Sequence, residues 1–329
     1  MANRKATAKS YSNIAFIKYW GNRDQALRLP LNDSLSMNLE ALTAETTVQF
    51  DDLLGEDKIS INDMEVADTA RNRISAQLDR VRAEAKITAH ARVASRLNFP
   101  ASTGLASSAA GFAALSLAAT RAAGLELSEI ALSVLARHGS GSACRSIPGG
   151  FVEWIASMSS ATSFARSIAP ADYWDLRDVV VIVTDKPKRV GSSEGHLVAT
   201  TSPFMGERIS RLPGRFHRAK RAILSRDLAA LGPDIEAEAT ELHVIAMTSH
   251  PPVYYWSPEM VRVIEAARAW REQGLPVYFT LDAGPNVHLI CEGKDAEVVA
   301  NNVRSLEGVQ QVIVSGAGGP AHVVENHLF

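Results

Sequence analysis

The stretch that decides the fold is Pro100-Ala101-Ser102-Thr103-Gly104-Leu105-Ala106-Ser107-Ser108-Ala109, which follows a strand-like segment over 92–99. Pro100 cannot extend the interior of a sheet, and Gly104 permits a tight backbone and the close approach of a ligand. Residues 107–119 are almost entirely Ala, Leu, Ser and Phe, which predicts a helix. Because the start of a helix carries unpaired N–H groups and a partial positive charge, this pattern is typical of a phosphate-binding loop.

A plainer interpretation is that the two serines only cap a buried helix, and for an isolated Gly-Ser-Ser this is the commoner case. The phosphate interpretation predicts that hydroxyl groups in the first helical turn reach the phosphates, and that Ser107 or Ser108 reaches a bound metal ion. The residues expected to form this nucleotide site are Pro100, Gly104, Leu105, Ala106, Ser107 and Ser108. Other segments of the chain decide between the two interpretations.

Composition limits the class of protein. The chain has 329 residues, enough for two domains, and its 46% hydrophobic and 21% charged residues are ordinary for a soluble globular protein. A net charge of -2 argues against a protein that coats nucleic acid or anionic lipid. Cys144 and Cys291 form no CxxC pair, which excludes a disulfide scaffold and a cysteine-rich zinc site. No apolar secretion signal or membrane-spanning stretch is evident, so we expect a cytoplasmic protein with no membrane partner.

Strand-like and helix-like patterns alternate along the chain, which predicts an α+β fold. Ser128 and Ser257 are expected to be helix N-caps, and Gly139 and Gly274 are expected to follow helix ends. The polar segment 185–195, which contains Gly and Ser, is the best candidate for a mobile loop and a domain boundary, giving domains 1–185 and 186–329. The expected helices are 68–85, 107–119, 129–138, 258–273 and 295–306, and the expected strands are 46–50, 58–61, 92–99, 179–184, 275–281 and 311–314.

Two residues stand out as candidates for chemistry. Lys18 lies among Ile, Phe, Tyr and Trp, so its amine must either extend to solvent or meet a carboxylate or phosphate. Asp282 ends a strand just before a Gly-Pro turn, and such a position holds a carboxylate rigidly, as a general base requires. Taken alone, a surface lysine and a turn-forming aspartate are the commoner cases.

The segment 138–146 combines hydroxyl groups, glycines and an arginine. Ser140, Ser142 and Arg145 on a flexible glycine turn suit a doubly anionic ligand, because Arg binds a carboxylate or phosphate through two hydrogen bonds. Arg145 could equally form a structural salt bridge. Cys144 is expected to be a small buried residue rather than a nucleophile. The nine histidines show no metal-ligand spacing, so none is assigned to a metal.

The basic run 208–226 could bind nucleic acid or an acidic partner. It contains no interleaved aromatic residue apart from Phe216, and Glu236, Glu238 and Glu241 follow nearby. A solvated helix face with salt bridges is therefore the favoured interpretation, and no nucleic-acid partner is expected.

Five segments together resemble one branch of the GHMP family of small-molecule kinases, the mevalonate diphosphate decarboxylases. They are NIAFIKYWGNRD (13–24), LPLNDSLSMNL (29–39), NFPASTGLASSAAGFAAL (98–115), GSGSACRS (139–146) and YFTLDAGPNVHL (278–289). They follow that branch's order over almost the whole chain, and KYWG and GSGSACRS are not general kinase motifs. The resemblance implies a two-domain GHMP-kinase-like fold: an N-terminal ribosomal-protein-S5-like α/β domain and a C-terminal ferredoxin-like α+β domain that carries Asp282.

The resemblance also implies the chemistry. With ATP and Mg²⁺, such an enzyme phosphorylates the tertiary 3-hydroxyl of a 5-phosphorylated mevalonate, and loss of that phosphate and of CO₂ gives an isopentenyl product. Asp282 would take the hydroxyl proton or orient the hydroxyl, Lys18 would pair with Asp282, and Arg145 would hold the substrate carboxylate. Tyr19, Ser140 and Ser142 would contact the 5-phosphate end, and the 186–195 loop, with Lys188 and Ser192, would close over ATP. A homodimer is common in such families.

The sequence departs from the branch at two places near the expected 5-phosphate. Asn22, a substrate-binding candidate, stands where the branch usually has lysine, and Leu197-Val198-Ala199-Thr200 contains no arginine. One charge-assisted hydrogen bond contributes about 1.5–3 kcal/mol, or roughly 10- to 100-fold in affinity. The departures therefore favour mevalonate 5-phosphate over mevalonate 5-diphosphate, which is the close alternative. A kinase that stops at the 3-phosphate would not need Lys18 and Arg145 in these positions.

Overall fold

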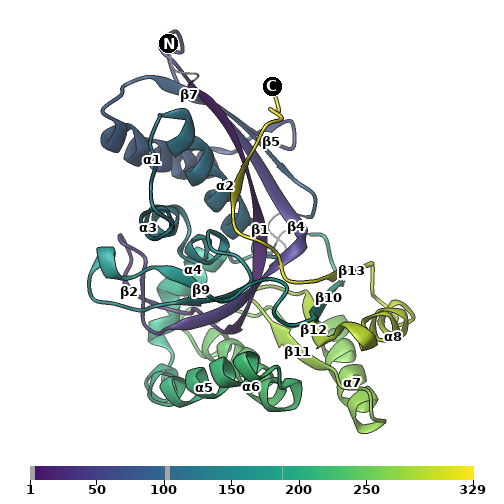
Figure 1. Ribbon diagram of the computed structural model, residues 1–329. Coiled ribbons are helices and arrows are strands. Elements are labelled where there is room, and N and C mark those ends of the chain that lie inside the picture. Colours follow the sequence, from purple (N-terminus) through teal and green to yellow (C-terminus); the bar gives the residue numbers. More distant parts are fainter. Residues whose placement is uncertain (1–3, 101–103, 187) are drawn as a thin grey trace.

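The computed structural model describes residues 4–100, 104–186 and 188–329. Its larger sheet has the strand order β14-β1-β4-β7-β5-β6, with β8 paired to β4 and β9 paired to β8. β1 and β4 are the long, paired strands at the centre of this sheet (Figure 1). The strands of this sheet are β1 (Lys5–Ile17), β4 (Ser34–Asp51), β5 (Lys58–Ile61), β6 (Met64–Glu65), β7 (His90–Leu97), β8 (Phe151–Trp154), β9 (Ala165–Ala169) and β14 (His322–Val324).

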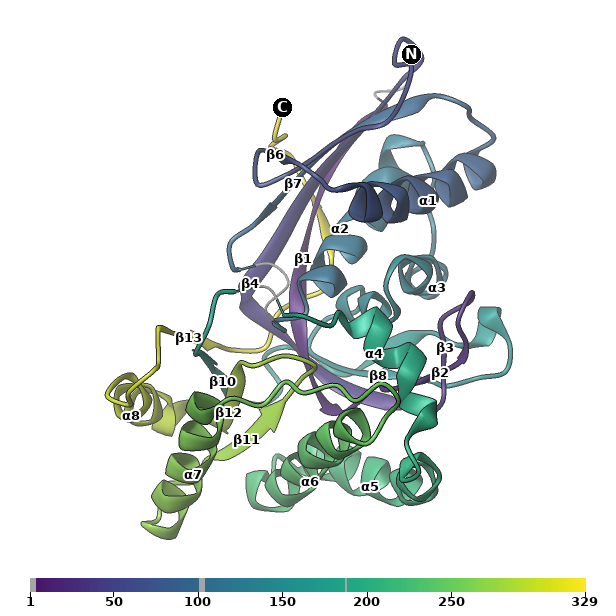
Figure 2. The same ribbon diagram turned by 180° about the vertical axis from the view of Figure 1, so that it is seen from behind.

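Three helices cover one face of this sheet: α1 (Asp68–Ala85), α2 (Ser107–Ala122) and α3 (Glu129–Gly139) (Figures 1 and 2). The predicted bounds of α1 are confirmed. Helix α2 is buried along almost its whole length because its side chains are small and apolar, and it packs on β1 and β4. Ser128 caps α3 as predicted, since its side chain accepts a hydrogen bond from the Ala131 N–H at 3.2 Å.

The smaller sheet has the antiparallel order β11-β12-β10-β13. Val179 and Val181 of β10 face the core beneath α7 and α8, whereas Val180 and Ile182 face the core shared with α5, α6 and the larger sheet. The continuous apolar run predicted over 179–184 is thus explained, because the strand is buried on both faces. The elements of this region are β10 (Leu176–Ile182), α5 (Met205–Ser225), α6 (Leu228–Met247), α7 (Pro258–Glu272), β11 (Tyr278–Leu281), β12 (Val287–Glu292), α8 (Gly293–Arg304) and β13 (Gln311–Ser315).

Each of the two sheets contains a strand from the other half of the chain. β10 precedes residue 185 yet pairs with β12 and β13 of the smaller sheet, and β14 returns from the far end of the chain to pair with β1. The division into 1–185 and 186–329 stays a prediction, and the sheets themselves divide near the start of β10. The mixed α+β architecture is confirmed. In the part of the chain that the structure describes, no helix has the length and apolar character needed to cross a bilayer.

Short elements connect these layers and correct three expectations. Gly139 is the last residue of α3 rather than the residue after it, and a Cβ there would lie 2.2 Å from the Phe112 ring, so tight packing explains the glycine. The segment 141–146 is a largely buried 3₁₀ helix, not a flexible turn. The polar loop over 185–195 is shorter than predicted because α4 already begins at Ser192. The short elements are β2 (Asn22–Asp24), β3 (Leu29–Pro30), η1 (Gly141–Ser146), η2 (Ser160–Thr162), α4 (Ser192–Val198) and η3 (Ala199–Thr201).

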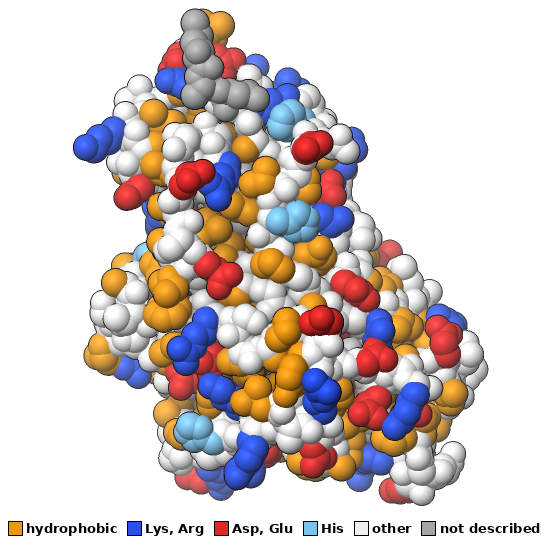
Figure 3. All heavy atoms as spheres, viewed as in Figure 1, with side chains coloured by type: hydrophobic (Ala, Val, Ile, Leu, Met, Phe, Trp, Pro, Cys, Tyr) orange, Lys and Arg blue, Asp and Glu red, His pale blue; other side chains and the backbone are white. Residues whose placement is uncertain are grey.

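The basic run 208–226 forms most of α5, and its side chains make ion pairs as predicted. The expectation of a fully solvated face is wrong for Arg208 and Arg215, because both are buried and pair with the buried Glu238 of α6. On the face viewed in Figure 3, basic and acidic side chains are interspersed.

Candidate active site

The centre of the site is a buried ion pair. Lys18 follows the end of β1 and Asp282 follows the end of β11, so two strand ends bring together residues 264 positions apart. The Lys18 Nζ lies 2.7 Å from the Asp282 Oδ1 and also donates to the Ala15 carbonyl at 2.6 Å. Only 1% of the Lys18 side chain is exposed, against 20% for Asp282. The lysine therefore meets a carboxylate rather than solvent, and the carboxylate retains an open side.

The charges around this pair keep Asp282 ionised. Burial alone would raise the pKa of Asp282, but Lys18, His288 and Arg145 together lower it below its usual value. Burial lowers the pKa of Lys18, and Asp282 opposes that effect. We infer that at neutral pH the pair is a carboxylate and an ammonium, which is the form that can accept or orient a hydroxyl proton.

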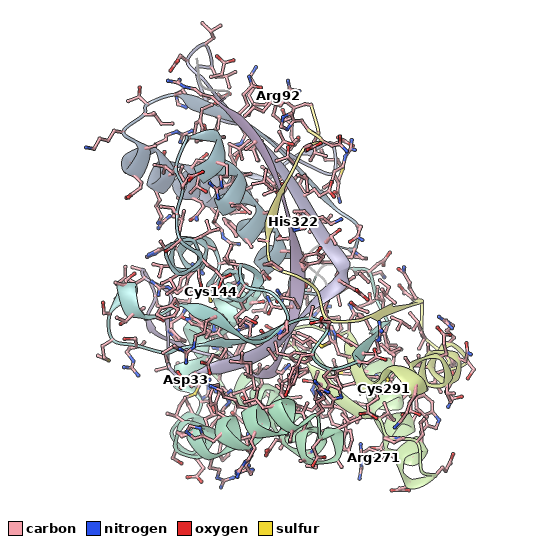
Figure 4. The ribbon with its side chains drawn as sticks, in the orientation of Figure 1. Asp33, Arg92, Cys144, Arg271, Cys291 and His322 are labelled. Carbon is pink, nitrogen blue, oxygen red and sulfur yellow. The ribbon has the colours of Figure 1, made fainter. Side chains whose placement is uncertain are left out.

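Arg145 is a buried cation held by neutral groups. Its Nε and Nη2 donate to the Asn13 Oδ1 at 3.2 and 3.0 Å, and its Nη1 donates to the Ser34 Oγ at 2.9 Å. Among the described residues no carboxylate lies within ion-pair distance of Arg145, so the structural salt bridge considered above is absent from that part of the chain. A fixed, uncompensated guanidinium suits an anionic ligand. Cys144 beside it is fully buried, and burial raises the pKa of its thiol to about 12, which agrees with a packing role; Figure 4 places Cys144 and Cys291 in different parts of the fold.

The residues predicted for the 5-phosphate end converge around an aromatic ring. Tyr19 stacks on His196 of α4 with ring centroids 4.0 Å apart, and its hydroxyl donates to the Asn22 Oδ1. A Cβ at Gly141 would lie 2.5 Å from the Tyr19 ring, so η1 approaches the ring closely and brings the neighbouring Ser140 and Ser142 with it. Ser140 is largely buried and Ser142 is partly exposed.

The phosphate loop touches the segment that carries Asp282. Gly104 has φ +96°, and a Cβ on it would lie 2.8 Å from the Gly284 Cα. Ala101, Ser102 and Thr103 lie outside the described residues, so what can be placed is the second half of the loop after Pro100. The Leu105 carbonyl accepts from the Ser12 Oγ at 2.6 Å, and Ala106, with φ +51°, leads into α2. The start of α2 is therefore fixed beside Asp282.

A pocket of about 190 Å³ opens beside this helix start, between α1, α2 and β7. Ser107 and Ser108 line it together with Arg73 and apolar side chains such as Ile74 and Phe112. A mostly apolar lining with a few polar side chains suits a nucleotide base, and the adjoining helix N-terminus suits its phosphates. The residues present thus fit ATP. Among the described residues, no group of three or more His, Cys, Asp or Glu side chains is arranged to hold a metal ion, and Ser107 and Ser108 stay the candidates that would contact Mg²⁺ alongside phosphate oxygens.

Lys188 connects the segment before α4 to the site. Its Nζ donates to the Ser192 Oγ at 2.8 Å and to the carbonyl of Ala283, the residue after Asp282. Burial lowers the pKa of Lys188 to about 8, and the Asp282 charge acts against that shift. Figure 2 shows α4 between the helices of the larger sheet and the α5–α6 pair.

Sequence reasoning missed the residues that hold Lys18 from behind. The Glu238 Oε1 accepts from the Lys18 backbone N–H at 3.0 Å, and Arg208 donates to the Lys18 carbonyl at 3.1 Å. Glu238 lies three residues after the buried Ile235 and four before the buried Leu242, so a carboxylate on the apolar face of α6 was the available signal. Sequence reasoning also missed Arg73, which lines the pocket beside α2, and His196, which stacks on Tyr19.

Comparison with known families agrees with this geometry. A family model described as the diphosphomevalonate decarboxylase-like N-terminal domain matches residues 10–165, and one described as the mevalonate 5-diphosphate decarboxylase C-terminal domain matches residues 178–319. The chain belongs to the mevalonate diphosphate decarboxylase family. It is therefore an ATP-dependent decarboxylase of the type that its motifs predicted.

Relatives of this decarboxylase cover most of the chain. The human diphosphomevalonate decarboxylase is 36% identical over 83% of this chain and 73% of its own. The phosphomevalonate decarboxylase of Haloferax volcanii is 31% identical over 98% of both chains. The mevalonate diphosphate decarboxylase structure from Staphylococcus aureus superposes with a TM-score of 0.93 at 36% identity, covering 98% of each chain, which confirms the predicted GHMP-kinase-like fold.

A further solved structure, 37% identical with a TM-score of 0.92, covers 98% of this chain and 99% of its own and is in complex with MVAPP, AMPPCP and magnesium. The predicted cofactors of this decarboxylase, ATP and Mg²⁺, agree with that nucleotide analogue and metal.

Proposed function

We propose that this decarboxylase acts on mevalonate phosphorylated at C5, in isoprenoid biosynthesis, and that mevalonate 5-phosphate, which gives isopentenyl phosphate, is its preferred substrate. One observation carries the reaction type: Gly104 contacts Gly284, two residues after the Asp282 that pairs with Lys18, and the charge of the uncompensated Arg145 acts on that pair. A general base, an arginine that can bind the substrate carboxylate and a phosphate loop thus lie in one site. ATP supplies the phosphoryl group that turns the 3-hydroxyl into a leaving group.

The residues of the chain then have distinct parts. The Asp282 carboxylate accepts the 3-hydroxyl proton or orients that hydroxyl, and Lys18 keeps the carboxylate ionised. Arg145 holds the substrate carboxylate, whose charge is lost as CO₂ leaves. The N–H groups and hydroxyls at the start of α2 bind the nucleotide phosphates, and Lys188 adds a cation beside them.

The preference for one phosphate rests on the neutral groups beside Tyr19. Asn22 already accepts from the Tyr19 hydroxyl and donates to the Gln25 Oε1 at 2.7 Å. Burial lowers the pKa of His196 to about 3, which makes its ring neutral at physiological pH, and the Gly21 N–H donates to its Nδ1 at 2.9 Å. Where related enzymes would use a lysine, this site presents an amide and a neutral imidazole.

The second candidate is mevalonate 5-diphosphate giving isopentenyl diphosphate. It is favoured by the relatives, most of which are diphosphomevalonate decarboxylases, whereas the Haloferax enzyme is a phosphomevalonate decarboxylase. The proposed enzyme is a homodimer in the cytoplasm and has no nucleic-acid partner.

The test is to offer each substrate separately with ATP and Mg²⁺ and to follow ADP, inorganic phosphate and CO₂. We expect CO₂ in step with ADP, with a kcat/KM about 10- to 100-fold higher for the 5-phosphate, as the loss of one charge-assisted contact implies. A higher kcat/KM for the 5-diphosphate would reject the role given to Asn22 and leave the reaction unchanged. ADP without CO₂ from either substrate would make the protein a 3-kinase.

A further inference from the structure

The β2–β3 hairpin carries a cation toward the site that the family motifs do not explain. Arg28, just before β3, has a left-handed φ of +50° and donates from its Nε to the His138 carbonyl at 3.1 Å. In return, the Arg137 Nε donates to the Leu27 carbonyl at 3.1 Å. These two bonds fix the tip of the hairpin against the end of α3, two residues before Ser140.

Arg28 has no acidic partner there. Among the described residues no carboxylate lies within ion-pair distance of its guanidinium, and the hydrogen bond to His138 uses only Nε, which leaves Nη1 and Nη2 for a ligand. Arg28 is partly buried, and its charge acts on Tyr19 and His196 as well as on His138, Arg73 and Arg80. A partly buried guanidinium that has no carboxylate within ion-pair distance favours an anionic ligand.

We propose that Arg28 binds the phosphate at C5 of the substrate and is the specificity residue that replaces the missing lysine. This inference rests on the proposed function. Asn22 cannot neutralise a phosphate, whereas the free Nη1 and Nη2 of Arg28 match two oxygens of one phosphate group. The related branch has a cation at position 22 and often another near 197–200, and this chain has neither. Arg28 supplies one cation in their place, which fits a substrate with a single phosphate.

The test is equilibrium binding, which does not require turnover. The dissociation constants of mevalonate, mevalonate 5-phosphate and mevalonate 5-diphosphate are measured by calorimetry for the wild type and for Arg28→Leu. We expect the 5-phosphate to bind about 10- to 100-fold more weakly to the variant, and unphosphorylated mevalonate to bind equally to both. Equal binding of the 5-phosphate to both proteins would overturn the proposal.

A matched control separates this contact from a general charge effect. Arg23 lies on the same hairpin, is exposed, and donates to the Met158 sulfur away from Tyr19, so Arg23→Leu should leave all three constants unchanged. A loss of 5-phosphate affinity in Arg23→Leu equal to that in Arg28→Leu would reject a specific contact.

A rescue variant separates ligand binding from a structural role of the Arg28 bond to His138. Adding Asn22→Lys to Arg28→Leu places a cation at the position where the related branch has one, and should recover at least tenfold in 5-phosphate affinity. No recovery, together with an equal loss of mevalonate binding, would assign Arg28 a structural role only. If Arg28→Leu does not fold, Arg28→Gln gives the same comparison. A wild type that binds none of the three ligands would instead reject the proposed function itself.

Discussion

At the scale of the residue, the ionisation of Asp282 depends on one neighbour. The carboxylate is largely buried, and burial by itself opposes its charge, but Lys18 at 2.7 Å lowers its pKa below the usual value. The wild-type carboxylate therefore stays ionised at the pH where an unperturbed aspartate begins to take up a proton. Above that pH, Asp282 imposes no acid limb on the reaction.

Replacing Lys18 by Met removes the cation and leaves the burial. The pKa of Asp282 should then rise above its usual value, so kcat should fall and an acid limb that the wild type lacks should appear in the pH profile. The measurement is kcat, determined from the rate of ADP formation, between pH 4.5 and 9. Lys9→Met, which breaks a more exposed pair with Glu45, is the control and should keep the wild-type profile. A pH profile of Lys18→Met with no acid limb would show that Asp282 is not a group on whose ionisation the reaction depends.

Residue chemistry predicted part of this arrangement. An amine among large apolar side chains had to meet an anion, and Lys18 does. The choice of Asp282 as its partner came from the resemblance, because nothing local in the sequence connects positions 264 apart. Hydroxyl caps such as Ser128 and Ser257 were predicted because their partners lie only three residues away.

At the scale of the element, α5 and α6 hold the end of β1 in place. Glu238 of α6 is fully buried and pairs with Arg208 and Arg215 of α5, while its Oε1 also accepts from the Lys18 backbone N–H at 3.0 Å. The sequence predicted ion pairs for this basic helix but placed them on a solvated face. Its burial depends on the packing of α5 against α6 and β4, which the sequence of α5 alone does not contain.

Glu238→Gln should destabilise the protein by about 3–5 kcal/mol, because it leaves the Arg208 guanidinium buried without a counter-charge. The Glu241 carboxylate still compensates Arg215 at 2.7 Å, so Arg208 dominates the loss. The free energy of unfolding is measured by urea denaturation. Glu207→Gln breaks an exposed pair with Arg211 and should cost less than about 1 kcal/mol. Similar losses in the two variants would contradict a buried network.

At the scale of the whole molecule, the site exists only where two distant loops meet. The sequence patterns predicted most of the long helices and strands. They could not show that β10 joins the smaller sheet or that β14 pairs with β1. Strand pairing across the chain is a nonlocal property, so the meeting of the phosphate loop with the Asp282 segment was likewise not readable from either motif. Gly104 against Gly284 is the contact that joins them.

Gly104→Ala tests whether that contact positions the reacting groups. The backbone at φ +96° is strained for alanine, and its Cβ would lie 2.8 Å from a backbone atom of Gly284, which cannot rotate away as a side chain would. The two loops must therefore separate, and a displacement of about 1 Å between reacting groups lowers kcat by about 100-fold.

We expect this loss of kcat with a free energy of unfolding that falls by only about 1–3 kcal/mol, the usual cost of local backbone strain. Steady-state kinetics with ATP and the preferred substrate, together with urea denaturation, measure both. Gly206→Ala is the matched control, since a Cβ there meets no atom within 4 Å, and it should keep the wild-type kcat. A wild-type kcat in Gly104→Ala would mean that the two loops align without this contact, and that the Lys18–Asp282 pair alone sets the geometry of the reaction.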